Sequence, residues 1–250
     1  MPLSDRVAIV TGSSRRIGRA IAEALARRGA AVVIHGKTSQ AATDETVAAI
    51  RANGGTAIGI LADISTPEGA GYLAECTLAA FGRIDILVNN AAVRRRVPFE
   101  QLTYSEWRDV TATILDGAFL CASACAEALK SSGHGRIISI GGAASFVGSP
   151  HHAHVIAAKA GLVGLTRALA YDLGPSGVTV NLVSPGLIET PDDDPKRSAE
   201  RRATTSPDKI ALGRVGGLGD VAEAVASLAG DEFSYMTGQI VHLNGGLYMG

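Results

Sequence analysis

Short β-branched segments alternate with longer helical segments along almost the whole chain. The apolar β-branched runs lie at residues 7–10, 32–34, 57–61, 84–88, 137–140, 178–182 and 239–242. The stretches with helical periodicity between them include residues 17–28, 40–52, 68–81, 104–130 and 153–173. Strands that are joined by crossover helices form a parallel sheet, and strands that are apolar throughout are buried on both faces. The pattern predicts an α/β fold: a doubly wound, Rossmann-type parallel sheet of seven strands with helices on both faces.

We expect residues 1–250 to form one domain, because the sequence contains no linker, internal repeat or low-complexity tract. The one interruption lies around residues 189–212, where the run PDDDPKRSAERR carries almost no apolar residue. A polar segment of this length in a compact domain is usually a lid or a binding loop. The interruption is therefore a candidate substrate loop.

Composition excludes several classes of protein. The 23 basic and 24 acidic residues nearly cancel, which argues against a nucleic-acid-binding surface. No apolar run approaches the roughly 18 residues that a membrane span needs, and the first residues show no leader pattern. Three cysteines without a CxxC pair are typical of core thiols in a reducing compartment. We expect a cytoplasmic protein with a small-molecule substrate and with neither nucleic acid nor membrane as a partner.

A glycine-containing loop, TGSSRRIG at residues 11–18, follows the first predicted strand and opens the first predicted helix. Backbone N–H groups and the positive end of a helix can bind a pyrophosphate there. An ordinary strand-to-helix turn is the alternative. Three further features favour a ligand site: NNAA at 89–92, Lys159, and PGLIET at 185–190. All of them are expected beyond the carboxyl ends of strands, where open α/β sheets bind ligands.

The order of these motifs resembles the short-chain dehydrogenase/reductase family, of the type of 3-oxoacyl-carrier-protein reductases. The matching motifs are TGSSRRIG, LADI at 61–64, NNAA, AAKAG at 157–161, NLVSPG at 181–186, and the closing Gly238-Gln239 and Asn244-Gly245-Gly246. The resemblance implies a nicotinamide dinucleotide, hydride transfer at a carbonyl and, in most members, a homotetramer. It also implies these cofactor-binding residues: Gly12, Ser14, Arg15, Arg16, Ile17, Gly18, Lys37, Thr38, Ser39, Asp63, Ile64, Asn90, Ala91, Lys159, Pro185, Gly186, Ile188 and Thr190.

The end of the second strand favours NADP(H), with NAD(H) as the alternative. Family members that prefer NAD carry an acid where this chain has Gly36, and Lys37, Thr38 and Ser39 follow it. An ammonium group and two hydroxyls can hold a 2′-phosphate, and Arg15 lies in the glycine loop on the same side. Alternatively, Lys37 is a solvated turn residue.

Arg16 is a departure within the glycine loop, because the family usually has glycine at this position. Pteridine-type reductases carry a basic residue here, so Arg16 need not block the dinucleotide. It does remove a flexible residue at a point where backbone approaches ligand.

The catalytic positions do not match the family. The family uses a tyrosine acid, a lysine four residues later, a serine that holds the carbonyl oxygen and an asparagine that anchors a water. This chain has Val155, Lys159, Gly142 and Ile114 at those positions. A valine cannot donate a proton, and a glycine has no side chain to hold an oxyanion. The sequence therefore does not support ketone reduction by the family mechanism.

Lys159 and His154 are the candidate catalytic residues. An imidazole could supply acid–base chemistry, although His151, His152 and His154 could equally be structural or surface histidines. We expect no metal, since the histidines lack a second cluster of ligands. The arginines at 94–96 either clamp an anionic substrate or form a solvated run or a subunit contact.

We therefore expect an NADP(H)-binding oxidoreductase that acts on a carbonyl or hydroxyl group with a non-standard active site. An anionic small molecule is one option for the substrate. Two alternatives stay open: a non-redox enzyme on the same fold, and a catalytically silent nucleotide-binding protein.

Overall fold

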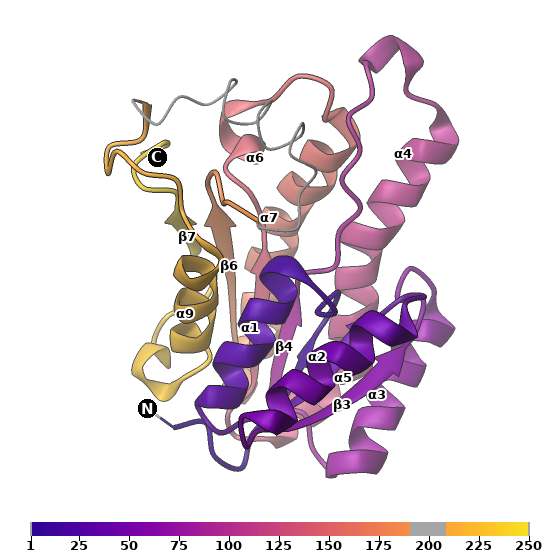
Figure 1. The fold of residues 1–250 in the computed structure, drawn as a ribbon, viewed down its shortest axis with the longest axis vertical. Coiled ribbons are helices and arrows are strands. Elements are labelled where there is room, and N and C mark those ends of the chain that lie inside the picture. Colours follow the sequence, from indigo (N-terminus) through magenta and orange to yellow (C-terminus); the bar gives the residue numbers. More distant parts are fainter. Residues whose placement is uncertain (1, 191–208, 250) are drawn as a thin grey trace.

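The computed structural model describes residues 2–190 and 209–249, and its seven strands form one parallel sheet in the order β3-β2-β1-β4-β5-β6-β7 (Figure 1). The strands are β1 (Val7–Val10), β2 (Ala31–Gly36), β3 (Thr56–Leu61), β4 (Ile86–Asn89), β5 (Arg136–Ile140), β6 (Thr179–Pro185) and β7 (Ile240–Leu243). The strand order reverses between β1 and β4, so the chain is wound outward in both directions from the middle of the sheet. The predicted doubly wound fold is confirmed.

Helices cover both faces of the sheet (Figure 1). They are α1 (Arg16–Arg27), α2 (Gln40–Ala52), α3 (Pro67–Phe81), α4 (Tyr104–Thr111), α5 (Gly117–Ser131), α6 (Ala144–Val147), α7 (Ala153–Leu173) and α9 (Leu218–Leu228). Side chains from α1, α2 and α9 share one buried cluster, and side chains from α3, α5 and α7 share a second. The two clusters lie on opposite faces, because neighbouring strand residues such as Ala8 and Ile9 belong to different clusters.

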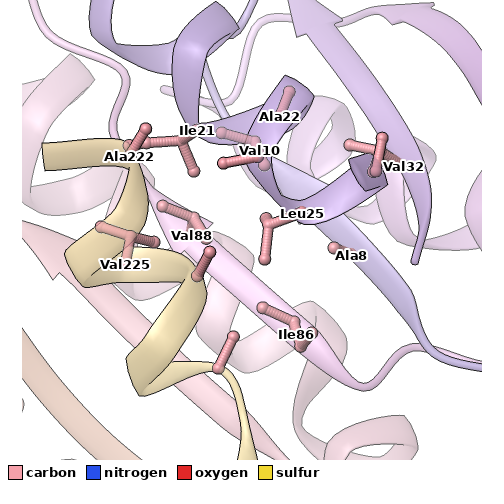
Figure 2. Close-up of a cluster of buried hydrophobic side chains, with 14 of the residues drawn as sticks. Ala8, Val10, Ile21, Ala22, Leu25, Val32, Ile86, Val88, Ala222 and Val225 are labelled. Carbon is pink, nitrogen blue, oxygen red and sulfur yellow. The ribbon is translucent and has the colours of Figure 1, made fainter. Parts of the chain in front are cut away.

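The cluster under α1 and α9 shows how the apolar pattern becomes a core (Figure 2). Ile21 and Leu25 of α1 are fully buried against the strand residues Val10 and Val88, and Val225 of α9 closes the cluster. Burying a side chain of this size stabilises the fold by about 1.5–3 kcal/mol. The core fixes the carboxyl ends of β1 and β4 relative to each other.

The predicted helices at 40–52 and 153–173 match α2 and α7 to the residue. The predicted helix at 104–130 is interrupted by a π-helical turn, Ala112–Asp116, between α4 and α5. Hydrophobic spacing does not separate a π turn from the α-helix around it. The helices α6 and α9 were not among the helices predicted, and the predicted strand at 84–88 begins two residues later, at Ile86.

Two helical stretches, 104–131 and 153–176, are long and apolar enough to cross a membrane by length and composition alone. Both pack on the sheet, and helices that cover a sheet in water-soluble proteins pass the same test. Only 39% of each apolar window is buried. Phe119 on α5 and Tyr171 on α7 are among the large side chains left exposed. The predicted substrate loop lies mainly outside the described residues, at 191–208.

Candidate functional site

The loops after β1 and β4 are bound to each other at the carboxyl edge of the sheet. The side-chain amide of Asn90 donates to the carbonyl oxygens of Thr11 and Gly12, at 2.9 and 3.1 Å. The Thr11 hydroxyl accepts the N–H groups of Asn90 and Ala91, at 2.9 and 3.0 Å. Gly12 has a φ of +63°, and a Cβ on it would lie 2.9 Å from the Ala91 Cα. The predicted residues Gly12, Asn90 and Ala91 therefore meet.

The amino end of α1 has the features of an anion site. A Cβ on Gly18 would lie 2.4 Å from the Gly12 oxygen, so the loop can turn into the helix only with glycine there. No side chain caps the first turn of α1 and no acidic residue lies in it. The N–H groups at this end and the positive helix end fit a pyrophosphate. Ser14 and Arg15 are accessible beside this end, whereas the Ile17 side chain is buried in the core.

Arg16 has a φ of +54°, in the left-handed region that favours glycine. A residue with a Cβ pays about 1–2 kcal/mol there, part of which is offset by the greater chain entropy that glycine loses on folding. Arg16→Gly should therefore raise the free energy of unfolding by about 0.5–1 kcal/mol, measured by urea denaturation. Arg15, at φ −162°, is the matched control, and Arg15→Gly should not stabilise the protein. Equal effects at the two positions would contradict the assignment of strain to Arg16.

Lys37 lies at the end of β2, where its ammonium group is 2.7 Å from the carboxylate of Asp63. Burial raises the pKa of Asp63, but hydrogen bonds from Lys37 and Ser65 hold it below its ordinary value. Asp63 therefore places a carboxylate against the ammonium group that the sequence predicts to hold a 2′-phosphate. A Cβ on Gly36 would lie 2.8 Å from the Thr43 hydroxyl, so an acid at this position would crowd α2.

Two other predicted contacts at this end of the site have structural roles. The Ser39 hydroxyl caps α2 by accepting the N–H of Ala42 at 3.4 Å. The Ile64 side chain is buried in the second core cluster, whereas Thr38 is exposed. Only Thr38 and Lys37 therefore present accessible side chains from the end of β2.

The loop after β6 lies at the same carboxyl edge of the sheet, beside the segments that follow β5 and β7. A Cβ on Gly186 would lie 2.8 Å from the Asn244 Cα, so this loop passes close to the segment after β7. The Pro185 carbonyl accepts the N–H of Ala143, which joins the loop to the end of β5. Ile188 packs into the core and Thr190 is buried.

Lys159 is the ionisable side chain in the middle of the site. Its ammonium group donates to the carbonyl oxygens of Ile140 and Gly141, at 2.6 and 2.9 Å. The side chain is 6% exposed. Burial, with a further contribution from the positive charge of Arg94, lowers the pKa of Lys159 to about 7. At neutral pH this amine can both give and take a proton.

The three substituted positions lie around Lys159. A Cβ on Gly142 would lie 3.7 Å from the Lys159 Cδ, so the missing serine position is adjacent to the lysine. Val155 is one helical turn before Lys159 on α7, and it packs with Ile114 in one buried apolar cluster. Ile114 itself lies within the π-helical turn. Apolar side chains thus occupy the two positions at which the resemblance places the family's tyrosine and asparagine.

His154 is fully buried, and neither ring nitrogen has a hydrogen-bond partner among the described residues. Burial lowers its pKa, and the charges that act on it come from Glu106 and Arg95 rather than from Lys159. No contact between His154 and Lys159 is seen in the described parts of the chain. A catalytic role for His154 stays a prediction.

The arginine run and the turn before α7 lie side by side. The N–H of Val97 donates to the His151 carbonyl at 2.9 Å. The positive charges of Arg94 and Arg96 act on His152, whose pKa is lowered mainly by burial. Arg95 pairs with Asp109 at 2.7 Å. The charge of Arg94 therefore acts on both Lys159 and His152.

Sequence reasoning missed His35, the fully buried histidine at the end of β2. Its ring contacts Gly12 in the glycine loop and Ala62 directly after β3. A histidine in an otherwise apolar strand was the available signal. Among residues 2–190 and 209–249, no group of three or more His, Cys, Asp or Glu side chains could hold a metal ion.

Comparison with known proteins identifies the family of this chain. Residues 12–248 match the family model described as enoyl-(acyl carrier protein) reductase. The chain is 41% identical to the 3-oxoacyl-(acyl-carrier-protein) reductase FabG of Escherichia coli K12, over the full length of both proteins. It is 38% identical to the (2S)-[(R)-hydroxy(phenyl)methyl]succinyl-CoA dehydrogenase subunit BbsD of Thauera aromatica, covering 98% of each.

Solved structures agree with these relatives. A putative short-chain alcohol dehydrogenase from Sinorhizobium meliloti 1021 superposes with a TM-score of 0.92, at 32% identity over 98% of this chain and 97% of that one. A putative NAD(P)-dependent gluconate 5-dehydrogenase from Beutenbergia cavernae, solved with bound NADP at low occupancy, gives 0.90 at 38% identity over 98% of each. The glycine loop, its partner loop after β4 and the lysine on α7 are the edge of an NAD(P)-dependent oxidoreductase fold. The chain belongs to the short-chain dehydrogenase/reductase family.

Proposed function

We propose that this protein binds NADP(H) and interconverts a carbonyl and a hydroxyl group on a small anionic molecule, with Lys159 as the proton carrier. The observation that carries the proposal is the position of Lys159: a buried amine with a pKa of about 7, beside Gly142 and below the loops that fit a dinucleotide. When bound, the dinucleotide supplies or accepts the hydride.

The chain's own residues then have defined tasks. The amino end of α1 holds the pyrophosphate, and the loops after β4 and β6 bound the site. Lys159 gives a proton to the developing alkoxide in the reductive direction and takes one in the oxidative direction. Gly142 and Val155 contribute no donor, so proton transfer depends on the lysine alone.

The positive charge near the site supports an anionic substrate. Arg94 acts electrostatically on both Lys159 and His152, and Arg96 acts on His152. A carboxylate or phosphate on the substrate would be attracted to this side of the site. Arg95 pairs with Asp109, and its charge acts on His154 rather than on Lys159, so it is the control. Arg94→Ala should weaken the binding of an anionic substrate more than Arg95→Ala does.

The direction in which kcat/KM changes with pH tests whether Lys159 is the proton carrier. Because the acid must be protonated, kcat/KM for reduction should fall as pH rises through about 7, approaching tenfold for each pH unit. Lys159→Met should remove this dependence together with most of the activity, whereas His154→Ala should keep the profile. A profile that is lost in His154→Ala would assign the proton to the histidine instead. The measurement is steady-state NADPH oxidation with a panel of anionic and neutral carbonyl compounds.

Cofactor preference depends on Lys37. We expect NADPH to bind at least about tenfold tighter than NADH, which is about 1.4 kcal/mol. Lys37 would exchange its contact with Asp63 for the 2′-phosphate, so Lys37→Ala should remove most of the preference. Lys130→Ala, at the far end of α5, is the control and should leave it unchanged. Equal affinities for NADPH and NADH in the unaltered protein, measured by fluorescence titration, would contradict the preference.

A catalytically silent nucleotide-binding protein is the second candidate. The apolar packing of Ile114 and Val155 favours it, because this packing leaves no polar group where the family has two. Tight NADPH binding without hydride transfer to or from any member of a carbonyl and alcohol panel would select this candidate.

A homotetramer also belongs to the proposal. The apolar windows of 104–131 and 153–176 are only 39% buried, and exposed side chains such as Phe119 and Tyr171 lie on these helices. A second copy would cover such faces. Sedimentation velocity should give a mass of about four chains rather than one.

The cysteine pattern supports a cytoplasmic location.

A further inference from the structure

His35 connects two segments that contact opposite parts of the proposed dinucleotide site. Its Nδ1 lies 3.0 Å from the backbone nitrogen of Gly12, in the glycine loop. Its Nε2 lies 3.0 Å from the carbonyl oxygen of Ala62, which directly precedes Asp63. The ring is buried, with 2% of the residue exposed. One imidazole therefore spans the gap between the glycine loop and the end of β3.

These partners allow one form of the ring. The Gly12 N–H is a donor, so Nδ1 must accept and carries no proton. The Ala62 carbonyl is an acceptor, so Nε2 must carry the proton and donate. The neutral Nε2–H tautomer satisfies both contacts. A doubly protonated ring would place two donors, Nδ1–H and the Gly12 N–H, against each other.

The backbone of the same residue adds two further links. The His35 N–H donates to the Ser13 hydroxyl at 2.9 Å, and the Ser13 N–H donates to the His35 carbonyl at 2.9 Å. Ser13 therefore stays attached to β2 whichever form the ring takes. Only the contact to Gly12 depends on the protonation of His35.

The surroundings of His35 disfavour its charged form. Burial lowers the pKa of His35 below 6.5, and this effect exceeds the opposing effects of the Ala62 hydrogen bond and the negative charge of Asp63. Asp63 is the charged group that acts on the ring, and it is itself paired with Lys37. The glycine loop contributes Gly12 and Ser13, neither of which titrates.

We propose that His35 is a positioning residue for the cofactor: its neutral imidazole holds Gly12 of the glycine loop in the conformation that binds the pyrophosphate, and protonation at acid pH removes this one contact. The inference rests on the proposed binding of NADP(H). It adds a residue that need not touch the dinucleotide and that makes binding dependent on pH.

Two substitutions at position 35 separate the effect of the hydrogen-bond acceptor at Nδ1 from the effect of protonating the ring. Asn places an acceptor oxygen close to the position of Nδ1 and does not titrate, so His35→Asn should bind NADP⁺ within about threefold of the unaltered protein at pH 7.5. Leu fills the space without an acceptor and leaves the Gly12 N–H unpaired, so His35→Leu should bind about tenfold more weakly. Thermal unfolding shows whether each variant is folded.

The pH profile supplies the second readout. The affinity for NADP⁺ should fall more steeply in the unaltered protein than in His35→Asn as the pH is lowered from 7.5 to the lowest value at which both proteins stay folded, measured by calorimetry. The 2′-phosphate of the ligand titrates near pH 6, but it does so equally for both proteins and cancels in the comparison. His134→Asn, a histidine paired with Asp231 at the other end of the sheet, is the matched control and should keep the unaltered profile.

Nitrogen NMR of the histidine rings tests the same idea without a substitution. The His35 ring should show an unprotonated Nδ1 and a protonated Nε2 at pH 7.5, and should gain a second proton as the pH falls. An Nδ1–H tautomer, or identical pH profiles in the unaltered protein and His35→Asn, would overturn the inference. Absence of any NADP⁺ binding at pH 7.5 would instead overturn the proposed function.

Discussion

Replacing Ile114, Gly142 and Val155 together by Asn, Ser and Tyr should raise kcat/KM for a 3-oxoacyl thioester by about 10²–10⁴-fold. The three side chains return an acid, an oxyanion donor and a water anchor to a site that retains its lysine. The gains are not additive, because such residues act as a unit. Steady-state NADPH oxidation by the unaltered and triple-substituted proteins measures the difference.

Of the three substitutions, Gly142→Ser is the one for which the structure shows open space. A Cβ on Gly142 would make an ordinary contact of 3.7 Å with the Lys159 Cδ and would meet no other atom of the described residues within 4 Å, apart from its chain neighbours. Val155→Phe, in the same background, is the matched control, since it has the bulk of tyrosine without its hydroxyl. An unaltered protein as fast as the triple variant, or a phenylalanine control as fast as the tyrosine, would show that the substituted positions do not limit catalysis.

The second large effect is on stability. Lys159 has a pKa of about 7 in the folded protein and 10.5 ordinarily, so the unfolded chain binds more protons between these values. The stability contribution is therefore complete above pH 10.5 and is lost as pH falls toward 7. Lys159→Met removes the titration, so the unaltered protein should gain about 3 kcal/mol relative to this variant between pH 7 and pH 10.

Urea unfolding at the two pH values measures this gain. Lys130→Met is the control: Lys130 lies at the exposed end of α5 and pairs with Glu127, so its removal should not change the pH dependence. Parallel stability curves for the unaltered protein and Lys159→Met would mean that Lys159 keeps its ordinary pKa in the fold.

Local patterns were enough to predict the sheet and most helices. Apolar runs marked the strands and helical periodicity marked most of the helices; Gly82 closes α3 in the left-handed conformation. The glycine loop, Asn90 and Lys159 were predicted to share one edge because parallel strands end together, and the structure brings them to that edge.

Contacts between segments distant in sequence could not be predicted in this way. The pairing of Lys37 with Asp63 and the contact of His35 with Gly12 each require the register of neighbouring strands. The role of Ser39 was ambiguous for another reason, since a hydroxyl before a helix can either cap it or bind a ligand. The left-handed backbone at Arg16 is likewise set by the loop and not by the preference of arginine.

The reversal of strand order between β1 and β4 separates most of the residues that fit the nucleotide from the three substituted catalytic positions. Side chains that fit the nucleotide come mainly from β1, β2 and β3, whereas Ile114, Gly142 and Val155 all come from segments that follow β4 in the chain. Substitutions at these three positions leave the loops after β1, β2 and β3 unchanged. Such a chain can lose one chemistry and acquire another while it keeps its coenzyme, which makes this scaffold a suitable starting point for directed evolution of new redox substrates.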